Sequence, residues 1–200
     1  MGKIIITSYG RSGTSLLVYL FTLLEYSTGF TPEVCAGQLK APHHAGLERM
    51  QFGPPVDHLE VIKNPDFCHT LQQYVKGGKE KIDDIVQIII PLRGVMAAAE
   101  SRYRNNLLWS NKGGYQIAGE KDKVLQNEKK YNGQSLGFLM DTIFLNDIPY
   151  TILKFPYFTR NARYTYFKLK PVLDLKNISY KTFKKAFLKA VDKNKIFENK

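Results

Sequence analysis

A short polar segment near the N-terminus combines glycines, hydroxyls and a guanidinium, which are groups that proteins use to bind phosphate and sulfate. It reads Gly10-Arg11-Ser12-Gly13-Thr14-Ser15. Glycines let the backbone turn sharply and approach a ligand closely, because no Cβ stands in the way. Hydroxyls donate hydrogen bonds to anionic oxygens, and Arg11 adds a planar cation that matches them. The segment therefore predicts a cradle for a small anion.

The residues around this cradle predict a strand before it and a helix after it. Ile4, Ile5 and Ile6 form a β-branched run, and an apolar run of helical composition follows Ser15. The unpaired N–H groups and the dipole at the start of a helix favour an anion there. The alternative is an ordinary strand, turn and helix with Arg11 in solvent.

The cradle differs from the common nucleotide P-loop, G-x-x-x-x-G-K-[ST], at the residue that binds the terminal phosphates. Gly13 and Ser15 fit the end of that pattern. However, Thr14 replaces the lysine, and Ser8 takes the first glycine position. A loop without that lysine is poorly equipped to hold a triphosphate with Mg²⁺. We therefore expect a short phosphate bound without metal, with the cation supplied by Arg11.

Apolar runs that alternate with helical patterns predict the fold class. Strands are expected at 4–6, 59–62, 85–92 and 150–155, and helices from residue 14, at 66–75, 95–108 and 136–145, and from about 180. This order predicts a single α/β domain over 1–200, with three α/β/α layers and a central parallel sheet of four to five strands. Two polar stretches, 28–53 and 110–137, are expected to be long functional loops. The second holds a short helix near 121–130 and is the expected lid.

A second anion site is predicted at the ends of two later strands. Arg93 follows the aliphatic run 85–92, and Ser101 lies eight residues further on, inside the next helix. Lys63 follows the shorter apolar run at 59–62. Because the carboxyl ends of parallel strands meet at one edge, these residues and the cradle are expected to lie together. A cation and a hydroxyl from two elements can then bind one anion.

Composition and charge limit the remaining choices. The chain has 29 Lys and Arg against 18 Asp and Glu, a net charge of +11. Residues 160–200, expected to be a basic helical C-terminus, carry +9 of it. This excess suits an anionic partner, and the alternative is a solvated lysine face. Two cysteines, Cys35 and Cys68, indicate no disulfide framework, and no metal-ligand cluster is seen. The longest apolar run is shorter than the roughly 20 residues that a bilayer requires, so we expect a soluble, cytoplasmic protein.

Together, the two sites resemble those of the sulfotransferases that use 3′-phosphoadenosine-5′-phosphosulfate (PAPS). The family loop [KR]-S-G-T-[ST] is similar to residues 11–15, and the family's Arg and Ser, eight residues apart, match Arg93 and Ser101. Lys63-Asn64-Pro65 is similar to the K-x-P step of tyrosylprotein and Golgi-type members. The resemblance implies a P-loop NTPase-like, nucleotide-kinase-like fold. It also implies that the cradle holds the 5′-phosphosulfate and that Arg93 and Ser101 hold the 3′-phosphate.

The resemblance further implies a reaction, transfer of a sulfuryl group to a hydroxyl of a polar acceptor such as a sugar, including one already anionic. The product nucleotide is 3′,5′-adenosine bisphosphate, and no metal is expected. Arg11 and Lys63 are the candidates for stabilising the leaving phosphate oxygen. Glu33 is the first candidate for the base that accepts the acceptor's proton. The other candidates are His43, His44, His58 and Glu60.

The chain departs from the family at two positions. Gly94-Val95 replaces the Asp-Pro that follows the family's Arg, and Leu16 replaces the aromatic residue that often stacks on adenine. Two other functions stay open. One is a nucleotide or metabolite kinase with a degenerate P-loop, and the other is a non-catalytic binder of polyanions or nucleic acid. We expect neither nucleic acid nor a membrane as the partner.

Overall fold

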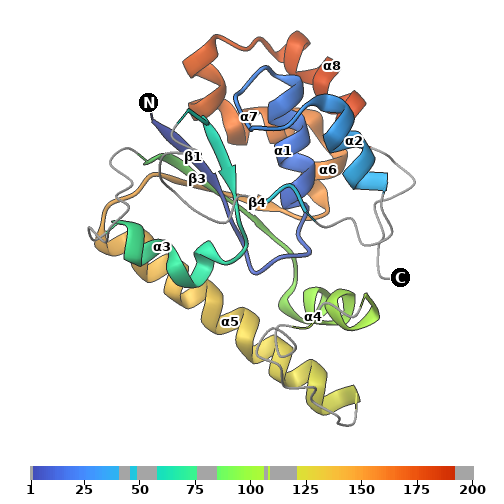
Figure 1. The fold of residues 1–200 in the computed structure, drawn as a ribbon, viewed down its shortest axis with the longest axis vertical. Coiled ribbons are helices and arrows are strands. Elements are labelled where there is room, and N and C mark those ends of the chain that lie inside the picture. Colours follow the sequence, from blue (N-terminus) through green and yellow to red (C-terminus); the bar gives the residue numbers. More distant parts are fainter. Residues whose placement is uncertain are drawn as a thin grey trace.

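A four-stranded parallel sheet forms the centre of the molecule. The computed structural model describes residues 2–40, 46–48, 58–75, 85–105, 108 and 121–191 (Figure 1). The strands are β1 (Lys3–Ile6), β2 (Val61–Lys63), β3 (Ile85–Leu92) and β4 (Tyr150–Lys154). Their order across the sheet is β2-β1-β3-β4, and every neighbouring pair is parallel. The expected α/β class and the parallel sheet are therefore confirmed.

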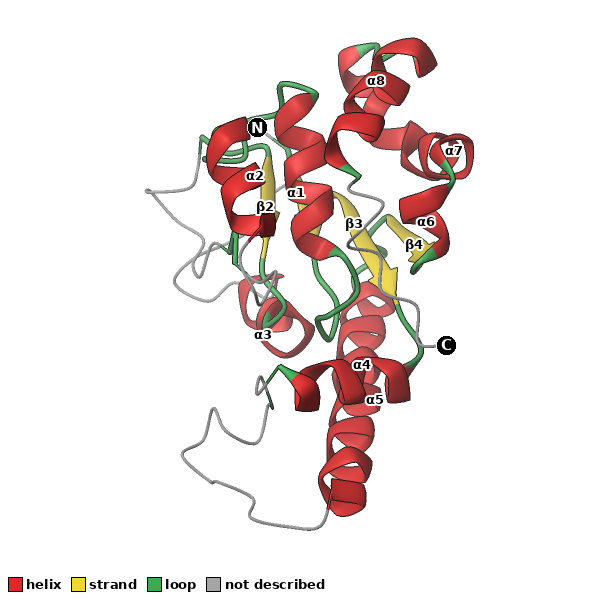
Figure 2. Ribbon diagram, turned by 90° about the vertical axis from the view of Figure 1, so that its right-hand side faces the viewer, coloured by secondary structure: helices red, strands yellow, loops and turns green. Residues whose placement is uncertain are grey.

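Helices cover both faces of this sheet (Figures 1 and 2). The described helices are α1 (Thr14–Leu23), α2 (Pro32–Lys40), α3 (Phe67–Val75), α4 (Val95–Arg104), α5 (Lys121–Leu145), α6 (Tyr157–Arg160), α7 (Ala162–Leu173) and α8 (Tyr180–Ala190). The helices α1, α2 and α6–α8 lie on one side, and α3 and α5 lie on the other.

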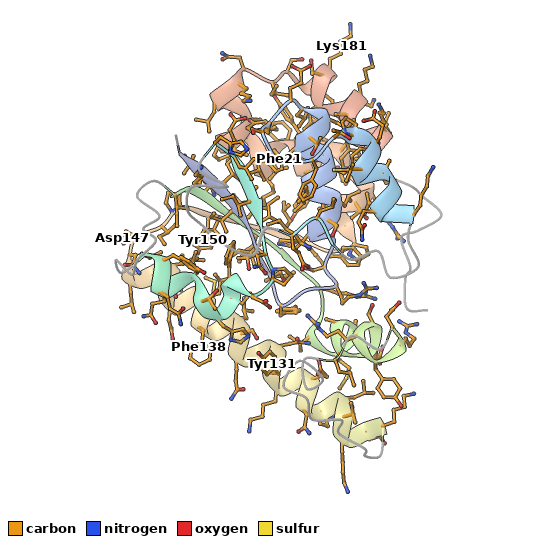
Figure 3. All side chains as sticks on the ribbon, viewed as in Figure 1. Phe21, Tyr131, Phe138, Asp147, Tyr150 and Lys181 are labelled. Atoms are coloured by element: carbon orange, nitrogen blue, oxygen red, sulfur yellow. The ribbon has the colours of Figure 1, made fainter. Side chains whose placement is uncertain are left out.

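The side chains of the strands alternate between two hydrophobic cores. Ile4 and Ile6 pack with α1, α7 and α8, whereas Ile5 packs with α3 and α5. Because successive residues of a strand point to opposite faces, an uninterrupted aliphatic run indicates a strand buried on both sides. β3 follows the same rule, since Ile89 belongs to the first core and Ile88 to the second. Figure 3 shows Phe21 of α1, which is fully buried in the first core.

The C-terminal part is helical, as expected, up to the last described residues. Ser179 caps α8 by accepting a hydrogen bond from the N–H of Thr182. The helix buries an apolar face of four residues, Phe183, Ala186, Phe187 and Ala190. Its lysines are exposed, and Lys181 points away from the molecule (Figure 3). Figure 1 shows α8 at the end of the molecule away from α4. Residues 192–200 lie outside the described part.

The structure corrects the two predicted long loops. The first one contains a helix, α2, and the second ends in the 25-residue helix α5, which begins at Lys121. The lid expected at 110–137 is therefore helical from residue 121 onward, and residues 109–120 lie outside the described part. Gly133 and Gly137 suggested a loop, but both face open space in α5, where a glycine only weakens a helix.

Polar residues on the buried face of α5 are a second reason why the sequence pattern did not predict the full length of this helix. The face includes Glu128, Asn132 and Ser135 beside aliphatic side chains such as Leu139. A helix is usually recognised by apolar residues on its buried side, and here that side is partly polar. Two of these polar side chains contact neighbouring helices. Ser135 Oγ lies 2.8 Å from the Nε2 atom of His69 in α3, and Asn132 donates to the carbonyl oxygen of Val95 in α4.

Candidate anion-binding site

The candidate site lies at the carboxyl edge of the sheet, where the loops after β1 and β3 begin. In the order β2-β1-β3-β4, the chain leaves β1 toward one side of the sheet and leaves β3 toward the other. Such a switch point separates two adjacent loops and is the usual place for a ligand in parallel α/β sheets. Residues 7–13 follow β1, and residues 93–94 follow β3.

The cradle is shaped by left-handed backbone at three of its four central residues. The φ angles are 83° at Gly10, 55° at Arg11 and 87° at Gly13. Left-handed and right-handed residues in succession turn several N–H groups toward one point and form an anion-binding nest. Arg11 accepts this conformation at a cost of about 1–2 kcal/mol. Strained backbone of this kind gathers at functional sites.

Glycine is required at both ends of the cradle because other groups crowd it. A Cβ at Gly10 would collide with the guanidinium of Arg102. A Cβ at Gly13 would lie 2.9 Å from Phe158 Cζ and 3.2 Å from Phe155 Cδ2. The loop is thus pressed between α4 on one side and the aromatic residues after β4 on the other.

Two buried hydroxyls, one in the cradle and one just before it, have no hydrogen-bond partner among the described residues. Gly13 is the N-cap residue before α1, and among the described residues no side chain caps this helix. The hydroxyls of Ser8 and Ser12 are fully buried, and within the described part of the chain neither has a hydrogen-bond partner. A buried hydroxyl without a partner costs about 1–3 kcal/mol, so it is uncommon unless a ligand satisfies it.

The predicted second site meets the first through Arg11. The Nε atom of Arg11 donates a hydrogen bond to Ser101 Oγ at 3.2 Å. Arg93 Nη1 lies 3.5 Å from the carbonyl oxygen of Arg11, and its guanidinium lies 5.3 Å from the ring centre of Phe155. The sequence predicted that Ser101 and Arg93 bind one anion together. In the structure, the Ser101 hydroxyl accepts a hydrogen bond from Arg11.

Several guanidinium groups converge here and repel one another. Burial lowers the pKa of Arg11, and the charges of Arg93 and Arg104 lower it further. Burial and Arg104 likewise lower the pKa of Arg93, although Glu100 opposes them. Since like charges are held close together at this edge, an anion between them would be strongly favoured.

Arg102 contacts the backbone just before the cradle, a role that the sequence did not predict. It is buried in α4 and donates a hydrogen bond to the carbonyl oxygen of Tyr9. Its Nε atom lies 4.0 Å from Glu128 Oε2 in α5. Burial lowers its pKa to about 10, and Glu128 opposes that effect. The Tyr9 hydroxyl donates to the carbonyl oxygen of Arg93, so the loops after β1 and β3 are tied directly.

Lys63 is the last residue of β2, which lies next to β1 on the side away from β3. Its Nζ atom lies 3.4 Å from Ser15 Oγ in the first turn of α1. It also contacts the carbonyl oxygen of Gly46 at 2.7 Å and Glu48 Oε1 at 3.0 Å. Burial lowers the pKa of Lys63, and Glu48 opposes that effect. The structure therefore brings Lys63 to the cradle, as predicted, and adds Glu48, which no sequence pattern indicated.

Glu33 is not placed with this group. It is exposed in the first turn of α2, where hydrogen bonds from its own N–H and from Thr31 lower its pKa. Two residues further on, Cys35 Sγ lies 3.6 Å from Thr22 Oγ1, near the end of α1. The cradle lies at the opposite end of that helix, roughly 15 Å away for ten residues. The sequence separation suggested proximity, but α2 begins beside the far end of α1.

Two other candidate bases, Glu60 and His58, lie before β2 and not at its carboxyl end. Glu60 precedes β2 and pairs with Lys176 at 2.7 Å, at the amino edge of the sheet. His58 precedes the same strand. His43 and His44 lie outside the described residues.

The described residues offer neither a metal-ligand cluster nor a membrane-spanning helix. They contain no group of three or more His, Cys, Asp or Glu side chains arranged to hold a metal ion. Over the same residues, no helix is both long enough and apolar enough to cross a membrane. Comparisons with protein-family models, curated proteins and solved structures returned no match.

Proposed function

We propose that this protein is a PAPS-dependent sulfotransferase with a P-loop NTPase-like core. The observation that carries the proposal is the contact between the two signature segments. Arg11 of the cradle reaches Ser101 at 3.2 Å, and Arg93 lies beside Arg11. The resemblance assigns these residues to the two ends of one nucleotide, and in the fold they form one cluster.

The residues present fit this cofactor. The uncapped start of α1 and the orphaned hydroxyls of Ser8 and Ser12 suit the phosphosulfate end. The guanidinium of Arg93 and the hydroxyl of Ser101 suit a separate 3′-phosphate. Phe155 is half-buried beside Arg93 and is the candidate for stacking on adenine in place of the family's aromatic residue. When bound, PAPS supplies an activated sulfuryl group.

The chain's own groups have defined tasks in this proposal. Charge develops on the leaving phosphate oxygen during sulfuryl transfer. The start of α1 would stabilise this charge, and so would the buried ammonium of Lys63 once one of its present contacts is released. A well-placed donor contributes about 3–4 kcal/mol. Arg11 and Arg93 neutralise the remaining charge of the nucleotide. The acceptor would be a hydroxyl of a polar molecule. Its oxygen would bond to sulfur as the bond between sulfur and the phosphate oxygen breaks, and its proton would pass to water.

The test is a comparison of nucleotides on Arg93→Ala, measured by calorimetry. Loss of a charge-assisted hydrogen bond of roughly 1.5–3 kcal/mol should weaken the binding of 3′,5′-adenosine bisphosphate by roughly ten- to hundredfold. Binding of 5′-AMP, which has no 3′-phosphate, should change little. Arg163→Ala is the matched control, because Arg163 also lies over a phenylalanine ring, that of Phe167, but in α7. It should leave the binding of both nucleotides unchanged.

Three outcomes would contradict the proposal. Equal losses for both nucleotides would remove Arg93 from the 3′-phosphate site. Nucleotide binding that strictly requires Mg²⁺, and is therefore abolished by EDTA, would favour the kinase. Salt-dependent binding to duplex nucleic acid with no effect of the bisphosphate would favour the polyanion binder. A direct assay of sulfuryl transfer from PAPS to a panel of sugars completes the test.

A further inference from the structure

Lys63 has its hydrogen-bonding capacity filled by the protein itself. An ammonium has three N–H donors. Here three oxygens surround it, from Ser15, Gly46 and Glu48, at 3.4, 2.7 and 3.0 Å. In this arrangement Lys63 has no N–H left for the oxygen of a ligand. One of these contacts must be released before Lys63 can bind an anion in the cradle.

The three acceptors differ in how easily they can leave. Ser15 belongs to α1, and its hydroxyl donates to the carbonyl oxygen of Gly46 at 3.0 Å. Leu47 is only 5% exposed and anchors the 46–48 backbone in the first core. By contrast, the Glu48 side chain is 36% exposed, whereas that of Lys63 is 2% exposed. Rotation of Glu48 into solvent would free one donor without moving the backbone.

The position of Glu48 also indicates what would replace it. Lys63 places a positive charge beside the N-terminal turn of α1, where the helix dipole already favours negative charge. Glu48 supplies a carboxylate at this point and supports the protonated form of the buried lysine against desolvation. An oxyanion of a ligand in the cradle could accept from Lys63 in the same way.

We propose that Glu48 is an internal anion that competes with the ligand for Lys63. Ligand binding replaces the carboxylate of Glu48 with a ligand oxygen, and Glu48 turns into solvent. Glu48 therefore lowers the affinity of the cradle for any anion that must displace it from Lys63. This inference rests on the anion site of the proposed function, but not on sulfuryl transfer.

The test measures inorganic pyrophosphate binding to Glu48→Gln by calorimetry. Removing the competing charge should lower the Kd of pyrophosphate by up to about fivefold, as for a partly exposed ion pair. Glu60→Gln is the matched control. It removes the same charge from a 2.7 Å pair with Lys176 at the other edge of the sheet, and it should change little. In a Lys63→Met background, the gain from Glu48→Gln should vanish.

Several results would overturn the inference. These are weaker or unchanged pyrophosphate binding in Glu48→Gln, an equal gain in Glu60→Gln, a gain that survives Lys63→Met, or no pyrophosphate binding in any variant. Failure of the sulfotransferase proposal looks different. In that case Glu48→Gln tightens pyrophosphate as expected, but wild type shows no preference for 3′,5′-adenosine bisphosphate over 5′-AMP.

Discussion

Gly13→Ala tests the claim that the cradle is pressed against the aromatic residues after β4. The new methyl group would lie 2.9 Å from Phe158 Cζ and 3.2 Å from Phe155 Cδ2. Phe158 is 1% exposed and has little room to move. Overpacking of this kind costs about 1–3 kcal/mol. The φ angle of 87° adds about 1–2 kcal/mol for a residue with a side chain. The expected loss of stability is therefore about 2–5 kcal/mol.

Urea and thermal unfolding measure this loss directly. For a chain of this length, each kcal/mol lowers Tm by about 2–4 °C, so a fall of about 4–20 °C is expected. Gly94→Ala is the matched control. Gly94 has a φ of −53° and a ψ of 131°, which any residue adopts, and a Cβ there meets nothing within 4 Å. Its cost should stay below about 1 kcal/mol. Equal unfolding midpoints for the two variants would refute the crowding of Gly13.

The remaining predictions concern α5 and the link between the two loops. Gly133→Ala and Gly137→Ala should each stabilise the protein by about 0.5–1 kcal/mol in urea unfolding, because alanine favours a helix and neither site is crowded. Destabilisation by both would argue against a continuous α5. Burial raises the pKa of Tyr9 from 10.0 to about 12, so the stability contributed by Tyr9 is complete below pH 10 and is lost as the pH rises toward 12. Tyr9→Phe should cost about 1 kcal/mol at pH 8 and should then lose less stability than wild type by pH 11. Parallel pH curves for the two proteins would contradict this assignment.

Sequence reasoning was most accurate where the signal is local. The bounds of β3, Ile85–Leu92, agree with the prediction, because a strand buried on both faces must be aliphatic along its length. The cradle after β1 was also predictable, since two glycines with positive φ are needed for its turn. Ser179 was recognisable as a cap because the capping hydrogen bond spans only three residues.

The helix α5 shows where local signals mislead. Its glycines and polar residues suggested a loop, yet 25 residues are helical. Packing against α3 and α4 decides this, since Asn132 donates to the carbonyl oxygen of Val95 and Ser135 contacts His69. Intrinsic propensity is a weak preference, and tertiary contacts outweigh it.

The sequence by itself determined that Arg11, Lys63 and Arg93 stand at or just after the carboxyl ends of β1, β2 and β3, because the alternation of strands and helices fixes where each strand ends. Only the tertiary structure decided which of them touch. Arg11 meets Ser101, and Lys63 meets Glu48. It also separated Glu33 from the cradle by placing the start of α2 beside the far end of α1. Such pairings depend on how helices pack across 15 to 90 residues of sequence, and short-range patterns carry no information about that packing.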